Sequence, residues 1–384
     1  MKEVTILMPC LNEAETIGKC IERARKLLID HNLDGEILVS DNGSTDASRE
    51  IARRLGARVV DCPVRGYGAA LQYGIQEAEG TYILMADSDD SYHFDEAMPM
   101  IEQLRNGFDV CMGTRLKGRI MPGAMPFLNR HLGNPVLTAL GRILFTIPVS
   151  DFHCGMRAFR RDAIIRLNLV TTGMEWASEM VIKSRLSGLR MTEVAVTLYK
   201  DGRNRPPHLK PWRDGWRHLR FMLLHAPTWL FILPGLFMML IGLIGEAVIS
   251  QDVVVIGNIG LDVHTMLVMS FILIIGVQTL FVGFFAKLFT QKTGILPHDE
   301  RFERIISHFT LERVLIVSVL IGGAGATGVL YAVWQWYQTG LSALNYQETM
   351  RELIPSLSMV AIGIQGIFNA FMLSTLYLST KSCN

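Results

Sequence analysis

The hydrophobic and polar positions divide the chain into two parts with different periodicities. In the first 110 residues, short apolar runs alternate with amphipathic segments that have helical spacing. The apolar runs predict strands at 4–8, 36–40, 58–62 and 81–86, and the amphipathic segments predict helices at 14–28, 45–55 and 69–79. Because short strands that alternate with helices form a sheet covered on both faces, we predict an α/β fold with a mostly parallel sheet.

Four long apolar runs follow in the second part of the chain, at residues 229–250, 265–289, 314–337 and 355–379. Each contains about 20 or more largely apolar residues, which is enough to cross roughly 30 Å of hydrocarbon. We therefore predict an α/β domain at residues 1–225 and a transmembrane domain of four helices at residues 229–380. Small residues in the third run should let a neighbouring helix approach closely, which permits self-association without requiring it.

The distribution of charged residues predicts the orientation in the membrane. The connection between the second and third runs contains Lys292, Arg301, Arg304 and Arg313. The connection at 251–264 contains no Lys or Arg. Since basic loops favour the cytoplasm, we expect both termini and the α/β domain on the cytoplasmic side. Glu246 is the one acidic residue within the four runs. We expect its carboxylate to extend to the membrane interface rather than to line an ion pathway.

Composition and charge narrow the range of partners. The net charge of +1 gives no reason to expect nucleic acid as a partner. Basic and aromatic residues do gather at 211–225, but this segment directly precedes a transmembrane run. We therefore expect it to form an interfacial helix that contacts anionic head groups of the lipid bilayer. The six cysteines include no C-x-x-C pair and are typical of reduced thiols.

Polar clusters follow the predicted strands, at 9–13, 41–46, 65–68 and 87–90. Because the carboxyl ends of parallel strands lie at one edge of the sheet, these clusters should converge on one crevice. Asp87 and Asp89 can bind a hard divalent cation such as Mg²⁺ or Mn²⁺, and a solvated turn that caps a helix is the alternative. Asp41 can accept hydrogen bonds from a nucleobase or ribose. Arg65 and Gly66 precede a helix whose N-terminus favours anions, with a plain turn as the alternative.

These clusters carry a resemblance to a known family. The sequences P-C-L-N-E at 9–13, S-D-N-G-S-T-D at 40–46, R-G-Y-G-A-A at 65–70 and D-S-D-D-S-Y at 87–92 resemble family 2 glycosyltransferases, which have the GT-A (Rossmann-like) fold. The resemblance covers roughly residues 1–220 and is greatest to dolichyl- and polyprenyl-phosphate mannosyl- and glucosyltransferases. It implies an inverting transfer of a hexose from a UDP- or GDP-linked donor to a polyprenyl or dolichyl phosphate. Such a product would serve the synthesis of envelope glycans, glycolipids or glycoproteins.

The resemblance also assigns roles to the residues of the clusters. It implies that the nucleoside is held by Pro9, Asn12, Glu13 and Asp41. It implies that the metal and the diphosphate of the donor are bound by Asp87 and Asp89, with Asp89 as a catalytic residue. Some relatives have a glutamine metal ligand two residues after the second aspartate, where this chain has Ser91.

Later segments resemble the acceptor side of the same enzymes. Residues 121–147 are similar to their interfacial helical hairpin. Arg115 and Arg130 match the arginines that bind the acceptor phosphate, and Asn134 lies in the same segment. We count both arginines among the catalytic residues, because guanidinium groups present paired donors that suit phosphate. Surface charge on an amphipathic helix is the alternative for both.

The remaining candidates for donor binding come after residue 150. Asp151 and Arg157 belong to a segment that is similar to one beside the donor sugar in the family. The polar loop at 201–210 occupies the place where relatives often have R-x-x-S-K, but this chain lacks the Ser-Lys pair. Arg203, Arg205 and Lys210 are its candidate substitutes.

Other functions are weighed on particular residues. A processive polysaccharide synthase would carry Q-x-x-R-W, which is absent from this sequence. A glycolipid synthase that uses a diacylglycerol acceptor would need a general base to activate a hydroxyl group, for which Glu175 and Glu179 are candidates beside a plain solvated helix face. A non-catalytic membrane scaffold is a further alternative, and the intact Asp87–Asp89 pair argues against it.

Overall fold

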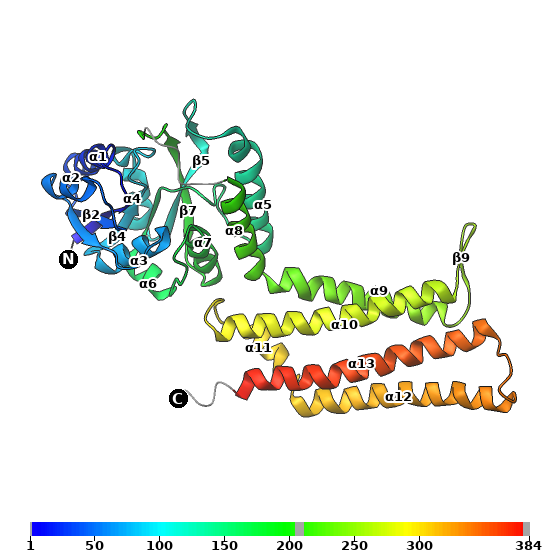
Figure 1. Cartoon of the computed structure of the whole chain (residues 1–384). Helices are drawn as coiled ribbons and strands as arrows, with labels where there is room; N and C mark the ends of the chain where they lie inside the picture. The colour runs from blue at the N-terminus through cyan, green and yellow to red at the C-terminus, as the bar shows by residue number, and fades with distance from the viewer. Residues whose placement is uncertain (1, 204–210, 379–384) are drawn as a thin grey trace. The chain divides into compact units, whose positions relative to one another are not determined.

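The computed structural model describes residues 2–203 and 211–378, and the chain divides into two compact units, Met1–Leu224 and His225–Asn384. The first unit contains a seven-stranded sheet with the order β3-β2-β1-β4-β6-β5-β7 (Figure 1). The strands are β1 Lys2–Cys10, β2 Gly35–Asp41, β3 Arg58–Asp61, β4 Gly80–Met85, β5 Val110–Ile120, β6 Arg157–Arg160 and β7 Met191–Leu198. Only β6 runs antiparallel to its neighbours, so the predicted mostly parallel sheet is confirmed.

Helices that cover the sheet bury apolar side chains against it. Helix α1 buries Ile17, Cys20, Ile21, Ala24 and Leu27, which recur at helical spacing. The helices of this unit are α1 Ile17–Asp30, α2 Ser48–Arg54, α3 Tyr67–Glu77, α4 Met98–Arg105, α5 Asn134–Phe145, α6 Arg161–Arg166, α7 Trp176–Leu186 and α8 Pro211–Leu224. The strands β6 and β7 were not predicted, because their apolar positions do not stand out from the surrounding sequence.

The segment after β4 departs most from the expected elements. Strand β5 runs from Val110 to Ile120, and its register to β7 shifts between Thr114 and Arg119. Residues 121–147 contain a π-helical turn, Asn129–Gly133, followed directly by α5. Helix α5 ends at Phe145, and the next residue, Thr146, adopts a left-handed conformation with φ 54°.

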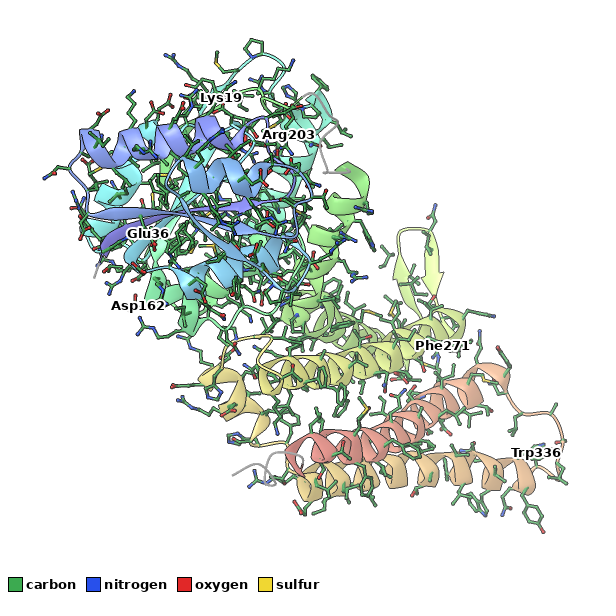
Figure 2. All side chains as sticks on the ribbon, turned by 60° about the vertical axis from the view of Figure 1, so that its left-hand side comes forward. Lys19, Glu36, Asp162, Arg203, Phe271 and Trp336 are labelled. Carbon is green, nitrogen blue, oxygen red and sulfur yellow. The ribbon has the colours of Figure 1, made fainter. Side chains whose placement is uncertain are left out.

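The second unit contains four helices that are long and apolar enough to cross a membrane, with mean hydropathy between 1.6 and 2.3. They are α9 Leu233–Ile249 with the preceding turn Thr228–Ile232, α10 Val263–Lys292, α12 Leu311–Gln338 and α13 Tyr346–Leu378. A hairpin of β8 Val254–Ile256 and β9 Ile259–Leu261 joins α9 to α10, and α11 Glu300–Ile306 precedes α12. The predicted set of four apolar helices is confirmed, and exposed apolar side chains such as Phe271 and Trp336 cover their surfaces (Figure 2).

Close helix packing follows the small residues, as predicted. Helices α12 and α13 lie side by side (Figure 1), and a Cβ at Gly363 would lie 2.6 Å from the Cα of Gly322. A Cβ at Gly325 would lie 2.5 Å from the carbonyl oxygen of Ser356. The expectation for Glu246 is wrong, however. This residue is buried among α9, α10 and α13 rather than extended to the interface, because Ser358 of α13 offers it a hydrogen-bond partner.

Candidate active site

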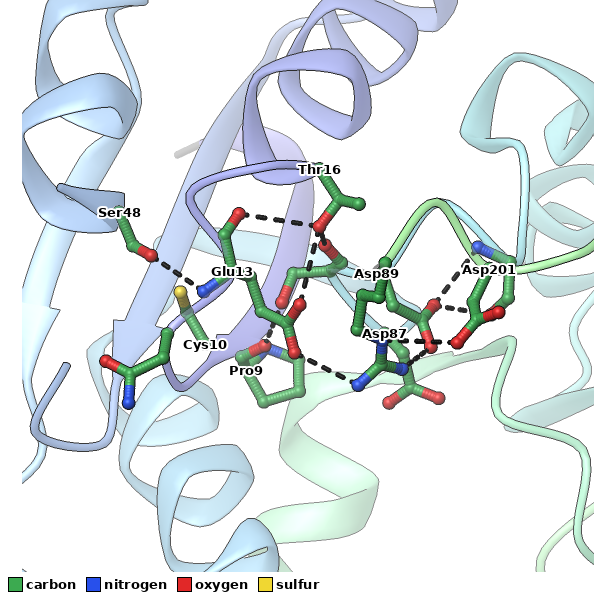
Figure 3. A network of polar contacts seen from close by, with 12 residues as sticks. Pro9, Cys10, Glu13, Thr16, Ser48, Asp87, Asp89 and Asp201 are labelled. Atoms are coloured by element: carbon green, nitrogen blue, oxygen red, sulfur yellow. Dashed lines mark hydrogen bonds and ion pairs between the residues drawn. The ribbon is translucent and has the colours of Figure 1, made fainter. Parts of the chain in front are cut away.

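Two neighbouring strands bring the first and the fourth polar clusters together. Strands β1 and β4 pair in parallel, with Leu7 opposite Met85, so the loops that follow them leave the same edge of the sheet. The hydroxyl of Ser88 donates to the carbonyl oxygen of Pro9 at 2.7 Å, and Thr16 donates to the carbonyl oxygen of Ser88 at 2.7 Å. Figure 3 shows the network that results, in which the carboxylates of both loops face one region.

Asp89 is held on one side and faces a cation on the other. Its Oδ1 accepts hydrogen bonds from the backbone N–H of Ser91 at 3.0 Å and from the Ser91 hydroxyl at 2.5 Å. Its Oδ2 forms an ion pair with the guanidinium of Arg203, which also lies 3.2 Å from Glu13 Oε1 and 3.5 Å from Asp201 Oδ2. The site therefore gathers negative charge around one internal cation.

A cleft of about 310 Å³ opens beside this ion pair. Its lining consists of Asn12, Glu13, Ala14, Glu15, Asp46 and Arg203. Figure 2 labels Arg203 on the side-chain view of this unit. The cleft thus connects the loop after β1 with the loop that begins at Asp201.

Asp87 is the partly buried partner of Asp89 in the acidic pair. Burial, and next the negative charge of Asp89, raise the pKa of Asp87 from 3.8 to about 6. The hydroxyl of Tyr67 donates to Asp87 Oδ1 at 2.9 Å. Sequence reasoning missed Tyr67, although its place in R-G-Y-G at the start of α3 was the available signal. A second cation would relieve the repulsion between the two carboxylates, so the chemistry of the pair fits a divalent metal.

Asp41 has one carboxylate oxygen that lacks a hydrogen-bond partner in the part of the chain that the structure describes. Its side chain is 1% exposed, and Oδ2 accepts hydrogen bonds from the N–H groups of Gly43 at 3.0 Å and Ser44 at 2.9 Å. Its Oδ1 is buried and has no hydrogen-bond partner among the described residues. Because an unpaired buried acceptor is costly, this atom suits a donor group supplied by a ligand.

Other residues expected in the nucleotide-sugar site have mostly structural contacts. Asn12 has φ 58°, and its Oδ1 accepts from the N–H of Thr45 at 2.7 Å, which ties two loops together. The N–H of Gly66 donates to Asn42 Oδ1 at 2.7 Å, and a Cβ at Gly66 would lie 2.2 Å from the carbonyl oxygen of Thr172. Arg65 is exposed. A side chain at position 66 would therefore clash with the backbone, which explains the glycine, and Arg65 is accessible to a ligand.

Arg115 and Asp151 bind each other. The guanidinium of Arg115 donates to both oxygens of Asp151, at 2.6 and 2.8 Å, and the pair is buried. Arg157 is fully buried and donates to the carbonyl oxygens of Cys154 at 2.9 Å and Ala177 at 2.8 Å. Asp151 and Arg157 thus stabilise the loop before β6 through these contacts.

The comparisons with known proteins identify the family of this chain. Residues 5–167 match the family described as Glycosyl transferase family 2, and residues 284–377 match the Glycosyltransferase family 2 C-terminal transmembrane region. The chain is 35% identical over 378 residues to the low-salt glycan biosynthesis hexosyltransferase of Haloferax volcanii. The aligned residues are 97% of this chain and 89% of the relative. This chain belongs to glycosyltransferase family 2. The glycosyltransferase is a membrane protein, since it has four helices that are apolar enough to cross a membrane and the family's transmembrane region includes the last two of them.

Two further similarities concern the N-terminal unit. The dolichyl-phosphate hexose transferase of Haloferax volcanii is 31% identical over 198 residues, which are 50% of this glycosyltransferase and 82% of the relative. A solved structure of glucosyl-3-phosphoglycerate synthase from Mycobacterium tuberculosis, in complex with Mn²⁺, UDP and glucosyl-3-phosphoglycerate, has 25% sequence identity and a TM-score of 0.47. That similarity covers 58% of this chain and 79% of the solved chain.

The acceptor candidates of the glycosyltransferase lie on an accessible segment. Arg130 is exposed on the π-helical turn, and the Asn134 amide lies 3.5 Å from Met125 Sδ. Among the described residues, no contact joins Arg130 to Arg115. Exposed apolar side chains cover the same segment, namely Met121, Phe127, Leu128, Leu132, Val136 and Ile143. Lys210 and Arg205 fall outside the residues that the structure describes.

Glu179 cannot serve as the general base that a hydroxyl acceptor would require. It is fully buried, and it accepts hydrogen bonds from the N–H groups of Val170 and Thr171 and from the Thr171 hydroxyl. Lys183 forms an ion pair with it at 2.9 Å. Burial opposes ionisation, but these hydrogen bonds outweigh it and lower the pKa of Glu179. The glycosyltransferase therefore uses this carboxylate to hold the turn before α7.

Proposed function

We propose that this glycosyltransferase moves a hexose from a UDP- or GDP-linked donor to a polyprenyl or dolichyl phosphate, with inversion of configuration. The observation that carries the proposal is the acidic site at the ends of β1 and β4, where Glu13 and Asp89 surround the Arg203 cation and Asp87 lies beside Asp89. We further propose that residues 1–225 form the catalytic domain and that residues 229–380 anchor it in the membrane.

The donor is assigned to this acidic site. Asp87 and Asp89 are the residues that would hold Mg²⁺ or Mn²⁺. A bound divalent cation would neutralise the donor diphosphate and stabilise the departing nucleotide. Asp41 Oδ1 would accept a hydrogen bond from the base or ribose, beside Pro9, Asn12 and Glu13. Removal of metal by EDTA should abolish transfer, and Mg²⁺ or Mn²⁺ should restore it; undiminished activity in EDTA would contradict the metal assignment.

The cations around the cleft are assigned to the donor as well. Arg203 is already drawn to the carboxylates, and a bound diphosphate would offer its guanidinium a second anionic partner. Lys210 is proposed for the same diphosphate, and Arg65 with Gly66 for the approach of the phosphates to α3. Asp151 and Arg157 would shape the wall beside the sugar.

The acceptor is assigned to the accessible segment after β5. Its exposed apolar side chains suit a membrane surface, and Arg130 and Arg115 would bind the acceptor phosphate together with Asn134. A phosphate is already ionised near neutral pH and attacks without a general base, which agrees with the engaged state of Glu179. The name of the dolichyl-phosphate hexose transferase supports this class of acceptor.

The basic loop at 290–313 supports an orientation with the catalytic domain and both termini on the cytoplasmic side.

The experiment that tests the function uses the full-length protein in a bilayer with polyprenyl phosphate and a panel of radiolabelled UDP- and GDP-hexoses. We expect one donor to give a labelled lipid phosphate. Failure of every donor to label the lipid, with the protein folded, would contradict the proposal.

A further inference from the structure

A buried carboxyl group lies inside the membrane unit, outside the proposed transferase site. Glu246 of α9 is 5% exposed, and its Oε1 lies 2.8 Å from the hydroxyl oxygen of Ser358 on α13. The hydroxyl oxygen of Ser270 on α10 lies 2.5 Å from the same Ser358 oxygen. These three residues, called the Glu246 cluster below, join three helices of the unit.

Apolar layers close the Glu246 cluster on both sides. In the next turn toward the β8–β9 hairpin, each of the three helices contributes one buried apolar residue, and these pack together: Ile249, Met266 and Ile354. In the opposite direction, a Cβ at Gly242 would lie 2.4 Å from the backbone nitrogen of Leu273, so α9 and α10 touch there. An ionised carboxylate between two such layers would carry a large desolvation cost.

The short contacts of Ser358 require more hydrogens than two serines supply. Besides Glu246 and Ser270, the Ser358 oxygen lies 3.0 Å from the carbonyl oxygen of Ile354. Each of the three oxygen–oxygen contacts needs one hydrogen. The two hydroxyl groups bring one each, and neither a carbonyl nor an ionised carboxylate brings any. A third hydrogen, on Glu246, gives each contact a hydrogen of its own, whereas an ionised Glu246 would leave the one Ser358 hydrogen shared between two acceptors.

A protonated Glu246 satisfies the whole cluster. Glu246 then donates to Ser358, Ser270 donates to Ser358, and Ser358 donates to the carbonyl oxygen of Ile354. The second carboxyl oxygen, Oε2, is buried without a hydrogen-bond partner among the described residues. As the carbonyl oxygen of a neutral carboxyl group, it tolerates that position far better than an anionic oxygen would.

We propose that Glu246, Ser270 and Ser358 form a proton-binding site in the membrane unit, which holds one proton at neutral pH and thereby joins α9, α10 and α13. The charged or titratable groups that come next along the neighbouring helices are His264 on α10 and Glu352 and Arg351 on α13. Arg351 pairs with Asp262 at 2.9 Å, and Glu352 accepts from Gln335 at 3.3 Å. These groups are thus engaged elsewhere, and a bound proton neutralises the Glu246 carboxylate.

Infrared difference spectroscopy on the full-length protein in a bilayer tests the proposal. We expect wild type minus E246Q at pH 7 to show the C=O stretching band of one protonated carboxyl group, with a shift in D₂O. The S358A variant should change the frequency of that band, because Ser358 accepts its hydrogen bond. A difference spectrum that contains carboxylate bands instead would overturn the proposal.

Thermal unfolding of the same preparations gives an independent reading. Glutamine is neutral and can donate to Ser358, so E246Q should keep the melting temperature near that of wild type, while E246A should lower it by several degrees. The control T327A alters an exposed residue of α12 whose hydroxyl donates to the Gly323 carbonyl oxygen of the same helix at 2.9 Å, and it should change little. The wild-type melting temperature should fall more steeply than that of E246Q as pH rises. An E246Q protein that melts as low as E246A would contradict the proton-binding site.

Discussion

Arg115 and Asp151 form a buried two-point ion pair between residues 36 positions apart in the chain. Arg115 Nε lies 2.6 Å from Asp151 Oδ2, Nη2 lies 2.8 Å from Oδ1, and the Arg115 backbone N–H donates to Oδ2 at 3.1 Å. The pair ties β5 to the loop before β6. It also fixes the guanidinium in one orientation, so an acceptor phosphate would bind to an arginine whose charge is already partly balanced.

The first prediction concerns the stability of this pair. Asp151→Asn leaves the Arg115 guanidinium buried without its counter-charge, which should lower the free energy of unfolding by about 3–5 kcal/mol. Chemical denaturation, followed by a spectroscopic signal from the first unit, Met1–Leu224, would measure this loss. The matched control is Asp162→Asn, which removes an exposed ion pair to Arg166 at 2.9 Å and should cost under about 1 kcal/mol. Equal losses in both variants would contradict the role of the buried pair.

The second prediction concerns the acidic pair. Asp89→Asn should leave the protein folded and lower kcat/KM by roughly a hundredfold or more, since about 3 kcal/mol of leaving-group stabilisation is lost. Asp90→Asn is the control, because the neighbouring Asp90 forms an ion pair with Arg23 at 3.0 Å. Normal turnover by a folded Asp89→Asn variant would show that this carboxylate does not serve the donor.

The strand-end residues were predictable because their position depends only on local periodicity. Asp41 and Asp87 each follow a short apolar strand, and parallel strands bring such ends together whatever the rest of the chain does. The contact between Asp89 and Arg203 was not predictable in this way, because it joins residues 114 positions apart through an irregular loop. Glu246 was misjudged because its burial depends on which face of α13 packs against α9.

The third prediction concerns the acceptor. Arg130→Ala should raise the KM for polyprenyl phosphate roughly ten- to a hundred-fold, the equivalent of about 1.5–3 kcal/mol for one charge-assisted contact. Binding of the nucleotide-sugar should stay almost unchanged. Titrations of both substrates on the same folded variant measure this. Arg142→Ala, an exposed arginine on α5, is the control for loss of charge on that segment. Weaker donor binding with an unchanged acceptor KM would assign Arg130 to the nucleotide site.

The fourth prediction concerns pH. Burial, and next the neighbouring His218 ring at 4.5 Å between centroids, hold the pKa of His153 well below its ordinary value of 6.5. The unfolded chain therefore takes up a proton as pH falls below about 6.5, while the folded chain does not, so stability is lost in that direction. The melting temperature should fall between pH 7 and about 5, and it should fall less in His153→Asn. Burial chiefly lowers the pKa of His93 as well, so His93 contributes to the same loss in both proteins. The difference between wild type and His153→Asn therefore reports on His153. Parallel curves for the two proteins would contradict the assignment.

The central claim is that the acceptor is a lipid phosphate, and a paired acceptor assay tests it most directly. The full-length protein in a bilayer is given its labelled nucleotide-sugar and Mg²⁺ or Mn²⁺, with polyprenyl phosphate, the matching polyprenol or diacylglycerol in separate reactions. Because the proposed site binds phosphate through Arg115 and Arg130, and an ionised phosphate needs no general base, we predict labelled product with polyprenyl phosphate alone. Equal labelling of the polyprenol or of diacylglycerol would contradict the account.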